Sequence, residues 1–345
     1  MASDYSPETI AKLSQFFTKS GLYRPLRVGR HEPGEELRYS IRGLIPAVGA
    51  AITLAVEKFV GGGFAGQVYK VRVKDIDAPD GPIPGLDPGG VYAMKILIPP
   101  SGRSRVFRDF IYALGFQSPF QLQVNPDAIV AGGLWQKFIR RAVAGRLGDE
   151  RAVVDVLATL VDPVLGSCGE ISEWVEGRTW RFEVDDNLLA RWSWKPGRDD
   201  EGLGSPEYCA KRQFMSDIVD TFHEVGAPEL ARQYEWWTCK SQPNALKRLD
   251  SGDTPDNGLT AVDFRAGLAL LPVIPMSPGD IKLIVKGLFR GSLVQFDRGN
   301  TQRLRDYVML HSDQFAGMEE ALERLIEHDR RYRAVSYTHL TLPTN

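Results

Sequence analysis

The sequence predicts an α+β fold in which a sheet-rich small lobe is followed by a mainly helical large lobe. Three observations lead to this class. Segments with the two-residue alternation of β-strands come first, at residues 53–60, 67–73 and 91–98, and segments with helical periodicity come later. A glycine-rich turn joins the first two strands, and the third strand carries Lys95. Because sheets and helices each need a partner layer to bury their apolar faces, this order indicates two lobes.

The helices follow from periodicity and from start and stop signals. Ser6 and Pro7 provide a capping serine and a proline at the first helical position, and Gly21 ends that helix. Residues 75–90 are rich in proline and glycine and predict a surface loop. The helices are expected at residues 6–19, 103–114, 134–144, 150–160 and 207–224, and in three pieces between 278 and 334. Two further strands are expected, at residues 169–175 and 258–263.

The composition is that of an ordinary globular protein. The 345 residues are 43% hydrophobic and 25% charged, with a formal net charge of −2, so no basic surface for nucleic acid is indicated. Cys168, Cys209 and Cys239 lack metal-ligand spacing, and we expect reduced thiols in a cytoplasmic protein. The longest uncharged run, residues 43–56, is shorter than the roughly 18–20 residues of a membrane-spanning helix. No transmembrane segment is therefore expected.

The glycine-rich turn indicates a phosphate-binding loop. Residues 61–68 read GGGFAGQV and fit the pattern G-x-G-x-x-G-x-V, with Gly61, Gly63 and Gly66 at the required positions. Glycine lets the backbone approach a phosphate because no Cβ intervenes. A dinucleotide fold needs a helix after the glycines. Here residues 67–73 alternate and are β-branched, which predicts a strand and a loop that covers the phosphates of a nucleotide.

The strand that carries Lys95 follows the glycine-rich turn. Residues 91–97 read VYAMKIL and closely resemble the V-A-x-K strand of protein kinases. This resemblance implies that Lys95 pairs with the α- and β-phosphates. Ala93 is expected to face the adenine, because a small side chain leaves room for a ring. Val60 and Val68 would supply the opposing apolar contacts.

Two later segments also resemble kinase elements. Residues 168–177 read CGEISEWVEG and are similar to a kinase hinge, which implies that the main chain between Glu173 and Val175 binds the adenine edge; an amphipathic edge strand is the alternative. Residues 260–265 read TAVDFR and resemble the DFG segment, which implies that Asp263 binds Mg²⁺. Phosphates carry too much charge for backbone groups alone, so a carboxylate-held metal is expected. Arg265 stands where that segment has glycine.

The expected catalytic loop departs from the kinase pattern. No H-R-D is present, and residues 242–244 read QPN, which most resembles the D-P-N of the ABC1 (UbiB-like) atypical kinase family. Gln242 then takes the place of the aspartate, and the metal-binding asparagine of the family falls on Lys247. In a second register Asn244 is the metal ligand and the base position falls on Cys239.

Neither register supplies a carboxylate base. Glu229 or Glu235, in the insertion before the loop, could substitute for one. Phosphoryl transfer depends mostly on positioning and charge neutralisation, and general-base help is worth about 10²–10⁴ in rate. An enzyme without the base would therefore be slow rather than inactive.

Taken together, the motifs resemble the protein-kinase-like superfamily over residues 55–270, and the ABC1 family in particular. The GQVY stretch at residues 66–69 matches that family, although glycines replace its alanines and its K-x-G-Q signature is not found. The DFRAG stretch at residues 263–267 is also similar to a segment of aminoglycoside-phosphotransferase-like enzymes. The resemblance implies a two-lobed fold with an antiparallel-sheet N-lobe and a mainly helical C-lobe.

The resemblance also implies ligands and an activity. ATP and Mg²⁺ would be the ligands of a phosphotransferase or ATPase that acts on an unknown protein or small-molecule acceptor. The alternative is a catalytically impaired pseudokinase, a nucleotide-binding scaffold for a protein partner. The acid that pairs with Lys95 is expected just before the fourth kinase strand, as Glu150 or Asp155.

These assignments divide the chain into four parts. Residues 1–49 are expected to form a helical extension and linker, residues 50–176 the nucleotide-binding N-lobe, and residues 177–335 the helical C-lobe. The final segment, residues 336–345, reads SYTHLTLPTN and resembles a translated sequencing adapter, so we expect it to be non-native.

Overall fold

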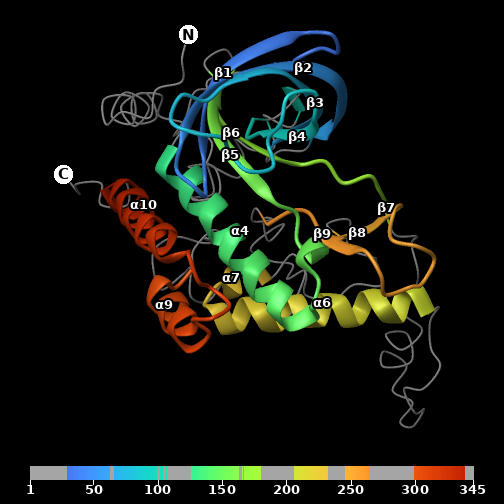
Figure 1. Ribbon diagram of the computed structural model, residues 1–345, viewed down its shortest axis with the longest axis vertical. Helices are drawn as coiled ribbons and strands as arrows, with labels where there is room; N and C mark the ends of the chain where they lie inside the picture. The colour runs from blue at the N-terminus through green and yellow to red at the C-terminus, as the bar shows by residue number, and fades with distance from the viewer. Residues whose placement is uncertain are drawn as a thin grey trace.

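Figure 1 shows the computed structural model of the chain, in which a β-barrel lies above a layer of helices. A small three-stranded sheet lies beside the helices. The residues that the structure describes are 29–62, 66–98, 102–103, 106, 126–162, 165, 167–179, 206–231, 245–264 and 299–338.

Six antiparallel strands form the barrel, in the spatial order β1-β2-β3-β4-β6-β5. They are β1 (Glu36–Gly43), β2 (Gly49–Gly62), β3 (Gln67–Asp77), β4 (Val91–Ile96), β5 (Val156–Asp162) and β6 (Ser167–Glu173). The strands predicted around the glycine turn and around Lys95 are confirmed as β2, β3 and β4. β1 pairs with both β2 and β5 and so leaves the sheet without a free edge.

The strands alternate between the barrel interior and its outer face. In β3, Gln67 and Tyr69 are buried inside the barrel, whereas the intervening Val68 and Lys70 face outward. Tyr69 belongs to an apolar core that the inward residues of all six strands share. One strand can therefore carry two different sets of contacts, one on each face.

The loop between β3 and β4 also contributes to this core. The sequence predicts a surface loop at residues 75–90, but β3 continues to Asp77 and the loop buries Ile83 and Leu86. A Cβ on Gly85, which has a positive φ, would lie 3.4 Å from the side chain of Leu157 on β5. The loop thus packs against the barrel.

The helices enclose a second apolar core. They are α4 (Pro126–Leu147), α6 (Pro206–Val225), α7 (Pro228–Ala231), α9 (Thr301–Leu310) and α10 (Glu319–Thr338). α4 contacts β5 and β6 as well as α6 and α10, and Figure 1 shows it running between the barrel and α6. The helices predicted at residues 134–144 and 207–224 are confirmed as parts of α4 and α6. The helix predicted at 6–19 and most of the one predicted at 103–114 lie outside the described residues. Of the stretch predicted as three helices between 278 and 334, the part before residue 299 also lies outside them, and the rest contains α9 and α10.

A small sheet packs into the helical core, to which it contributes Ala245, Leu259 and Ala261. Its strands, in the order β7-β8-β9, are β7 (Gly177–Thr179), β8 (Ala245–Arg248) and β9 (Leu259–Ala261). The amide of Val154 donates a 3.0 Å hydrogen bond to the carbonyl oxygen of Ala261, and Val153 forms an isolated bridge to the same residue. The strand predicted at residues 258–263 is therefore anchored to the chain that enters β5.

Two predictions about the barrel are wrong. The helix predicted at residues 150–160 is a short 3-10 helix, η1 (Glu150–Ala152), followed by β5. All of β5 is buried, so its apolar run has no alternation that could distinguish a strand from a helix. The second correction concerns the expected N-terminal linker, because β1 lies within residues 1–49 and closes the antiparallel sheet into a barrel.

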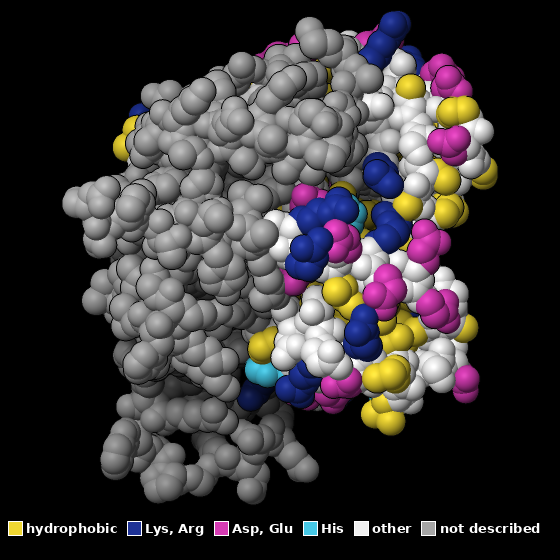
Figure 2. All heavy atoms as spheres, turned by 90° about the vertical axis from the view of Figure 1, so that its left-hand side faces the viewer, with side chains coloured by type: hydrophobic (Ala, Val, Ile, Leu, Met, Phe, Trp, Pro, Cys, Tyr) yellow, Lys and Arg dark blue, Asp and Glu magenta, His cyan; other side chains and the backbone are white. Residues whose placement is uncertain are grey.

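The described surface is mixed in charge. Figure 2 shows Lys and Arg side chains next to Asp and Glu on the described part of one face. On α10, for example, the Glu327 carboxylate pairs with Arg330 and Arg331, which holds the pKa of Glu327 at about 2. None of the described helices combines the length and the apolar character that a membrane span requires.

Candidate functional site

A cavity of about 400 Å³ lies where the barrel meets the small sheet. The barrel contributes β2, β3, β4 and β6 to its wall, and the small sheet contributes β8 and the residues after β9. Its lining is mainly apolar with a few charged groups. The lining residues are Val60, Val68, Ala93, Lys95, Val154, Glu170, Ser172, Glu173, Trp174, Val175, Glu176, Gly177, Leu246, Val262 and Asp263.

Lys95 and Asp263 meet at this cavity. The Lys95 Nζ donates a 3.0 Å hydrogen bond to the Asp263 Oδ1, although the two residues are 168 positions apart in the chain. The Lys95 side chain is 16% exposed and that of Asp263 is 36% exposed. The pair is therefore partly open to solvent, and a ligand that enters the cavity can reach both groups.

The neighbours of Asp263 determine which way its carboxylate points. Phe264 is 5% exposed, and its ring packs 5.6 Å from that of Phe222 on α6. Ala261 is fully buried beneath the barrel. Because Phe264 is held in the helical core, Asp263 is left at the cavity wall opposite β4. An aromatic residue after the aspartate thus acts as an anchor for it.

The two residues that flank the glycine turn, Val60 and Val68, line the same cavity. Gly61 and Gly62 at the end of β2 pair with Val68 and Gln67 of β3. A Cβ on Gly66 would lie 2.9 Å from the carbonyl oxygen of Ile96, so only glycine fits there without a shift of the backbone. Gly61 has open space around it. Gly63, the middle glycine of the motif, lies outside the described residues.

The apolar residues predicted to contact a base also line the cavity. Ala93 is on β4, two residues before Lys95, and Val60 and Val68 come from the strands on either side of the glycine turn. Val60 is 46% exposed, so its side chain is accessible from the solvent side of the cavity. These three residues form one apolar side of the cavity.

The predicted hinge forms the end of the cavity. β6 stops at Glu173, and the chain then passes through Trp174 and Val175 to β7. The Glu173 carboxylate accepts a 2.5 Å hydrogen bond from Arg248, which also donates to Thr260. β6 lies between β4 and β5 in the barrel, so it is not the edge strand of the alternative interpretation. After β6 the chain runs to the small sheet.

An exposed clasp joins the hinge to β3. One carboxylate oxygen of Glu176, Oε1, accepts from Lys70 Nζ at 2.9 Å and from Trp174 Nε1 at 2.6 Å. Lys70 Nζ also lies 4.9 Å from the centroid of the Trp174 ring. These two hydrogen bonds hold the pKa of Glu176 below its usual range. The clasp connects the two walls of the cavity at its mouth.

Sequence reasoning gave no role to several of the lining residues. Glu170 and Ser172 alternate on β6, and Glu170 is directly opposite Lys95 in the β4–β6 register. The two-residue period of strands could have identified this pair once β6 was placed beside β4. Val154 and Leu246 come from segments before β5 and in β8, and only the tertiary fold brings them to the cavity.

The prediction that Glu150 or Asp155 pairs with Lys95 is wrong. Asp155 pairs instead with Lys137 of α4, at 2.6 Å, and burial lowers the pKa of that lysine against the opposing effect of Asp155. Glu150 lies in η1, because the helix that was to present it is not formed. Within the described residues the carboxylate on Lys95 is that of Asp263.

The expected catalytic loop is largely outside the described residues. The part that is not described includes Cys239, Gln242, Asn244 and Glu235, together with the side chain of Glu229. Lys247, the metal position in one register, is described. Its Nζ donates to the carbonyl oxygens of Thr254 and Asn257 in the β8–β9 connection. Its ammonium group is therefore engaged by the hairpin that it belongs to.

The carboxylates of the cavity suit one kind of metal site. Among the described residues no group of three or more His, Cys, Asp or Glu side chains could hold a metal ion. Mg²⁺ is usually bound by one or two carboxylates together with waters and substrate phosphates. Asp263 offers one such carboxylate and Glu170 another in the lining. This donor set fits an Mg²⁺ that arrives with a nucleotide.

Comparison with known proteins yields matches among solved structures alone. No model of a known protein family matches the chain, and no curated protein matches it. The solved structures include the BubR1 kinase domain, at 14% identity and a TM-score of 0.32, with 96% of this chain and 98% of that chain covered.

Two further structures are also kinases. A point mutant of the PknI kinase domain of Mycobacterium tuberculosis matches at 17% identity and a TM-score of 0.28, covering 76% of this chain and 74% of that chain. Vaccinia related kinase 3 matches at 10% identity and a TM-score of 0.33, covering 93% and 80%. At these TM-scores a shared fold does not follow, so function has to be inferred from the cavity itself.

Proposed function

We propose that the protein is a kinase-like ATP-binding protein whose cavity between the barrel and the small sheet holds Mg-ATP. The observation that carries this proposal is the ion pair of Lys95 and Asp263 on the wall of an apolar cavity beside a glycine turn. A cation for phosphates, a carboxylate for a metal, and apolar walls for a base are the three features that an ATP site needs. Here they lie within one cavity.

Each wall has a distinct role in this proposal. Adenine packs against the apolar side that Ala93, Val60 and Val68 form, with its polar edge toward the backbone after Glu173. The phosphates lie under the glycine turn, where the backbone can approach them without Cβ atoms. Lys95 binds the α- and β-phosphates. Asp263 holds the Mg²⁺, which neutralises the charge of the phosphates when it is bound.

The ion pair itself supports this assignment of roles. In the structure Lys95 and Asp263 neutralise each other, and both are partly exposed. Because the pair is partly exposed, solvent screens the attraction between its charges and a ligand can replace either partner. Mg-ATP offers a better partner to each group, because the phosphates attract the lysine and the metal attracts the aspartate.

The reaction that follows binding is the second part of the proposal. We assign a slow phosphotransferase or ATPase activity, with an unidentified protein or small-molecule acceptor. The GQVY and QPN stretches favour the ABC1 type among kinase-like families. A nucleotide-binding scaffold is the competing function, and Gln242 at the base position favours it. The three scattered cysteines are consistent with a reducing, cytoplasmic setting.

Thermal unfolding with nucleotide tests the binding. ATP at 100 times its dissociation constant should stabilise the wild-type protein by about 2.7 kcal/mol, and Mg²⁺ should increase the effect. Lys95→Ala should remove the stabilisation. Lys74→Ala is the matched control, because Lys74 is an exposed lysine on β3 outside the cavity lining and its loss should change nothing.

Nucleotide turnover separates the two functions. Release of ADP that depends on Lys95 supports the enzyme, and tight ATP binding with no release supports the scaffold. If ATP does not shift the unfolding temperature of the wild-type protein at any Mg²⁺ concentration, the nucleotide site itself is refuted. An equal loss of stabilisation in Lys74→Ala would refute the role of Lys95.

A further inference from the structure

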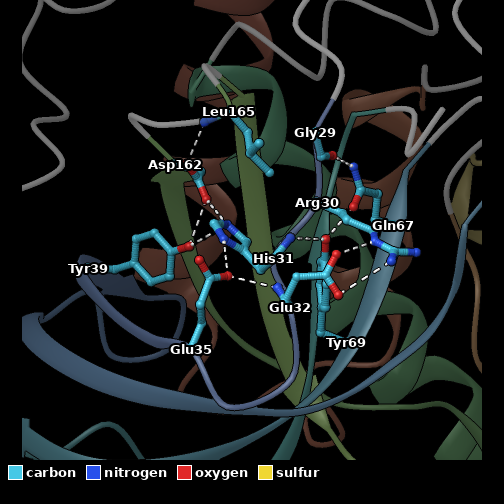
Figure 3. Close-up of polar contacts among 10 residues, drawn as sticks. All are labelled: Gly29, Arg30, His31, Glu32, Glu35, Tyr39, Gln67, Tyr69, Asp162 and Leu165. Carbon is cyan, nitrogen blue, oxygen red and sulfur yellow. Dashed lines mark hydrogen bonds and ion pairs between the residues drawn. The ribbon is translucent and has the colours of Figure 1, made fainter. Parts of the chain in front are cut away.

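A buried polar cluster lies on the inner face of the strand that leaves the glycine turn. Figure 3 shows it: residues 29–35, which precede β1, pass across the end of the barrel and place His31 among polar groups from three strands. His31, Tyr39, Gln67, Tyr69 and Asp162 are each no more than 5% exposed. None of these residues lines the cavity described above.

Both ring nitrogens of His31 face carboxylates. Nε2 lies 2.8 Å from Asp162 Oδ2, and Nδ1 lies 3.3 Å from Glu35 Oε2. An ionised carboxylate can only accept a hydrogen bond, so each nitrogen must carry a proton for both contacts to form. The geometry therefore corresponds to the imidazolium form of His31. A neutral ring could keep one contact but not both.

Asp162 is bound from three directions. Its Oδ2 accepts from the Tyr39 hydroxyl at 2.7 Å as well as from His31, and its Oδ1 accepts from the Leu165 amide at 2.8 Å. Burial by itself would raise the pKa of Asp162, but these hydrogen bonds lower it below its usual range. A charged carboxylate is thus kept at the end of β5, and it attracts a cation.

A chain of hydrogen bonds leads from His31 to the base of the glycine turn. The His31 amide donates to the Tyr69 hydroxyl at 3.0 Å, and that hydroxyl donates to Gln67 Oε1. Gln67 Nε2 donates to the Gly29 carbonyl oxygen at 2.6 Å, which closes the chain on residues 29–31. Gln67 is the first residue of β3, and it pairs in register with Gly62 and with Ile96, the residue after Lys95.

We propose that His31 is a positioning residue for the nucleotide site: residues 29–35 form a latch that holds Gln67, and through it the glycine turn, in the phosphate-binding position when His31 is protonated. The inference rests on the proposed ATP site. Alternation along β3 makes the coupling direct, because Gln67 and Tyr69 face the latch while Val68 between them faces the cavity.

The charges around His31 predict how the latch responds to pH. Among the described residues, the titratable groups that face the ring are Asp162 on β5, Tyr39 on β1, Tyr69 on β3 and Glu35 on its own segment. Arg30 is engaged with Glu32. Burial lowers the pKa of His31, but the hydrogen bonds and charges of Asp162 and Glu35 outweigh it and raise the pKa above 6.5. The latch is therefore complete at mildly acidic pH and loosens as pH rises through that pKa.

The experiment compares ATP with adenosine, which lacks phosphates. Dissociation constants of both are measured from pH 5.5 to 8.5 for the wild-type protein and for His31→Gln, whose amide can still donate to Asp162 but does not titrate. The wild-type protein should bind ATP roughly fivefold or more tightly at low pH than the variant does, a typical coupling between two sites. The two ATP curves should converge at high pH, and adenosine should bind both proteins equally.

Controls separate the latch from simpler causes. The phosphates of ATP themselves titrate in this pH range. Their titration affects the wild-type protein and His31→Gln equally, so only the difference between the two curves reports on His31. Gln67→Leu breaks the chain beyond His31 and should weaken ATP at all pH values without weakening adenosine. Lys74→Ala removes an exposed charge of β3 that lies outside both the latch and the cavity lining, and should leave both ligands unaffected.

Three outcomes would overturn the inference. Parallel ATP curves for the wild-type protein and His31→Gln would show that His31 does not act on the site. Equal weakening of adenosine would show that the segment merely supports the fold. Absence of ATP binding by the wild-type protein at every pH would refute the proposed function itself, and the latch with it. In that case the pH dependence of unfolding without nucleotide would still report whether the His31–Asp162 pair is charged.

Discussion

Two ion pairs lie on opposite faces of the same barrel wall, and they are built in opposite ways. Lys95 and Asp263 face the cavity with side chains that are 16% and 36% exposed. His31 and Asp162 face the barrel interior with side chains that are 5% and 0% exposed. The first pair joins β4 to the segment after β9, and the second joins residues before β1 to the end of β5.

The difference in burial separates a pair that can exchange partners from one that cannot. An exposed pair gains little from its mutual attraction, so water or a ligand can take the place of either partner. A buried pair has lost its solvation, and removal of one partner leaves a charge that nothing compensates. We infer that the open pair is suited to bind a ligand and that the buried pair is suited to hold β3 in place.

The largest expected effect is that of Asp162→Ala. Loss of the buried carboxylate leaves His31 and the Tyr39 hydroxyl without their acceptor, and breaking such a pair costs about 3–5 kcal/mol. Denaturant unfolding of the ligand-free protein measures this cost. Asp263→Ala is the matched control and should cost at most about 1 kcal/mol. Equal losses in the two variants would abolish the distinction between the pairs.

Asp263→Asn tests the open pair directly. The amide retains the shape of the carboxylate but not its charge, so we expect Mg²⁺-dependent ATP binding to weaken about tenfold or more, or about 1.4 kcal/mol. Binding of ATP without Mg²⁺ should not weaken, because Lys95 is released from its partner. Calorimetric titration with and without Mg²⁺ gives both values. An unchanged Mg²⁺ response would exclude Asp263 as the metal ligand.

The pH dependence of stability tests the buried pair without any ligand. The pKa of His31 is raised in the folded state, so its contribution is complete below the unfolded value of about 6.5 and is lost as pH rises through the folded value. The free energy of unfolding should therefore fall as pH rises above about 6.5 in the wild-type protein. His31→Gln should lack this decline, and a decline of equal size in both proteins would contradict the prediction.

The smallest effect is expected at the exposed clasp of the hinge. Lys70→Ala removes the ammonium that bridges β3 to Glu176 and lies over Trp174. Because Glu176 is exposed and keeps the hydrogen bond from Trp174, the melting temperature should change less than in any preceding variant. A shift as large as that of Asp162→Ala would place the structural anchor of β3 at the hinge instead of at His31.

Local patterns were enough to predict part of the site. The glycine turn, the strand with Lys95 and the strand before Asp263 were predicted because each is a short motif with its own period. Lys95 and Asp263 were each assigned a role through the resemblance of its own motif, and the structure brings the two side chains together. Gly63 and Asn244 remain predictions.

Contacts between distant segments could not be predicted from local sequence patterns. β5 was predicted as a helix because a fully buried apolar run has no distinguishing period. Glu150 and Asp155 were placed on that helix as the expected partners of Lys95, and this placement was therefore wrong. β1 was not predicted, and its pairing with both β2 and β5 is what closes the barrel.

The sequence by itself determined the chemistry available to this protein: a glycine turn, a lysine on a strand and an aspartate before a phenylalanine. These depend on residue type and short spacing, which the chain carries locally. The tertiary structure decided which charges meet and which are buried. Asp263 and Asp162 are both aspartates at strand ends, yet barrel closure and the path of residues 29–35 leave one at a cavity and enclose the other with His31. Burial is a property of the assembled fold, so only the fold could assign these two carboxylates their different roles.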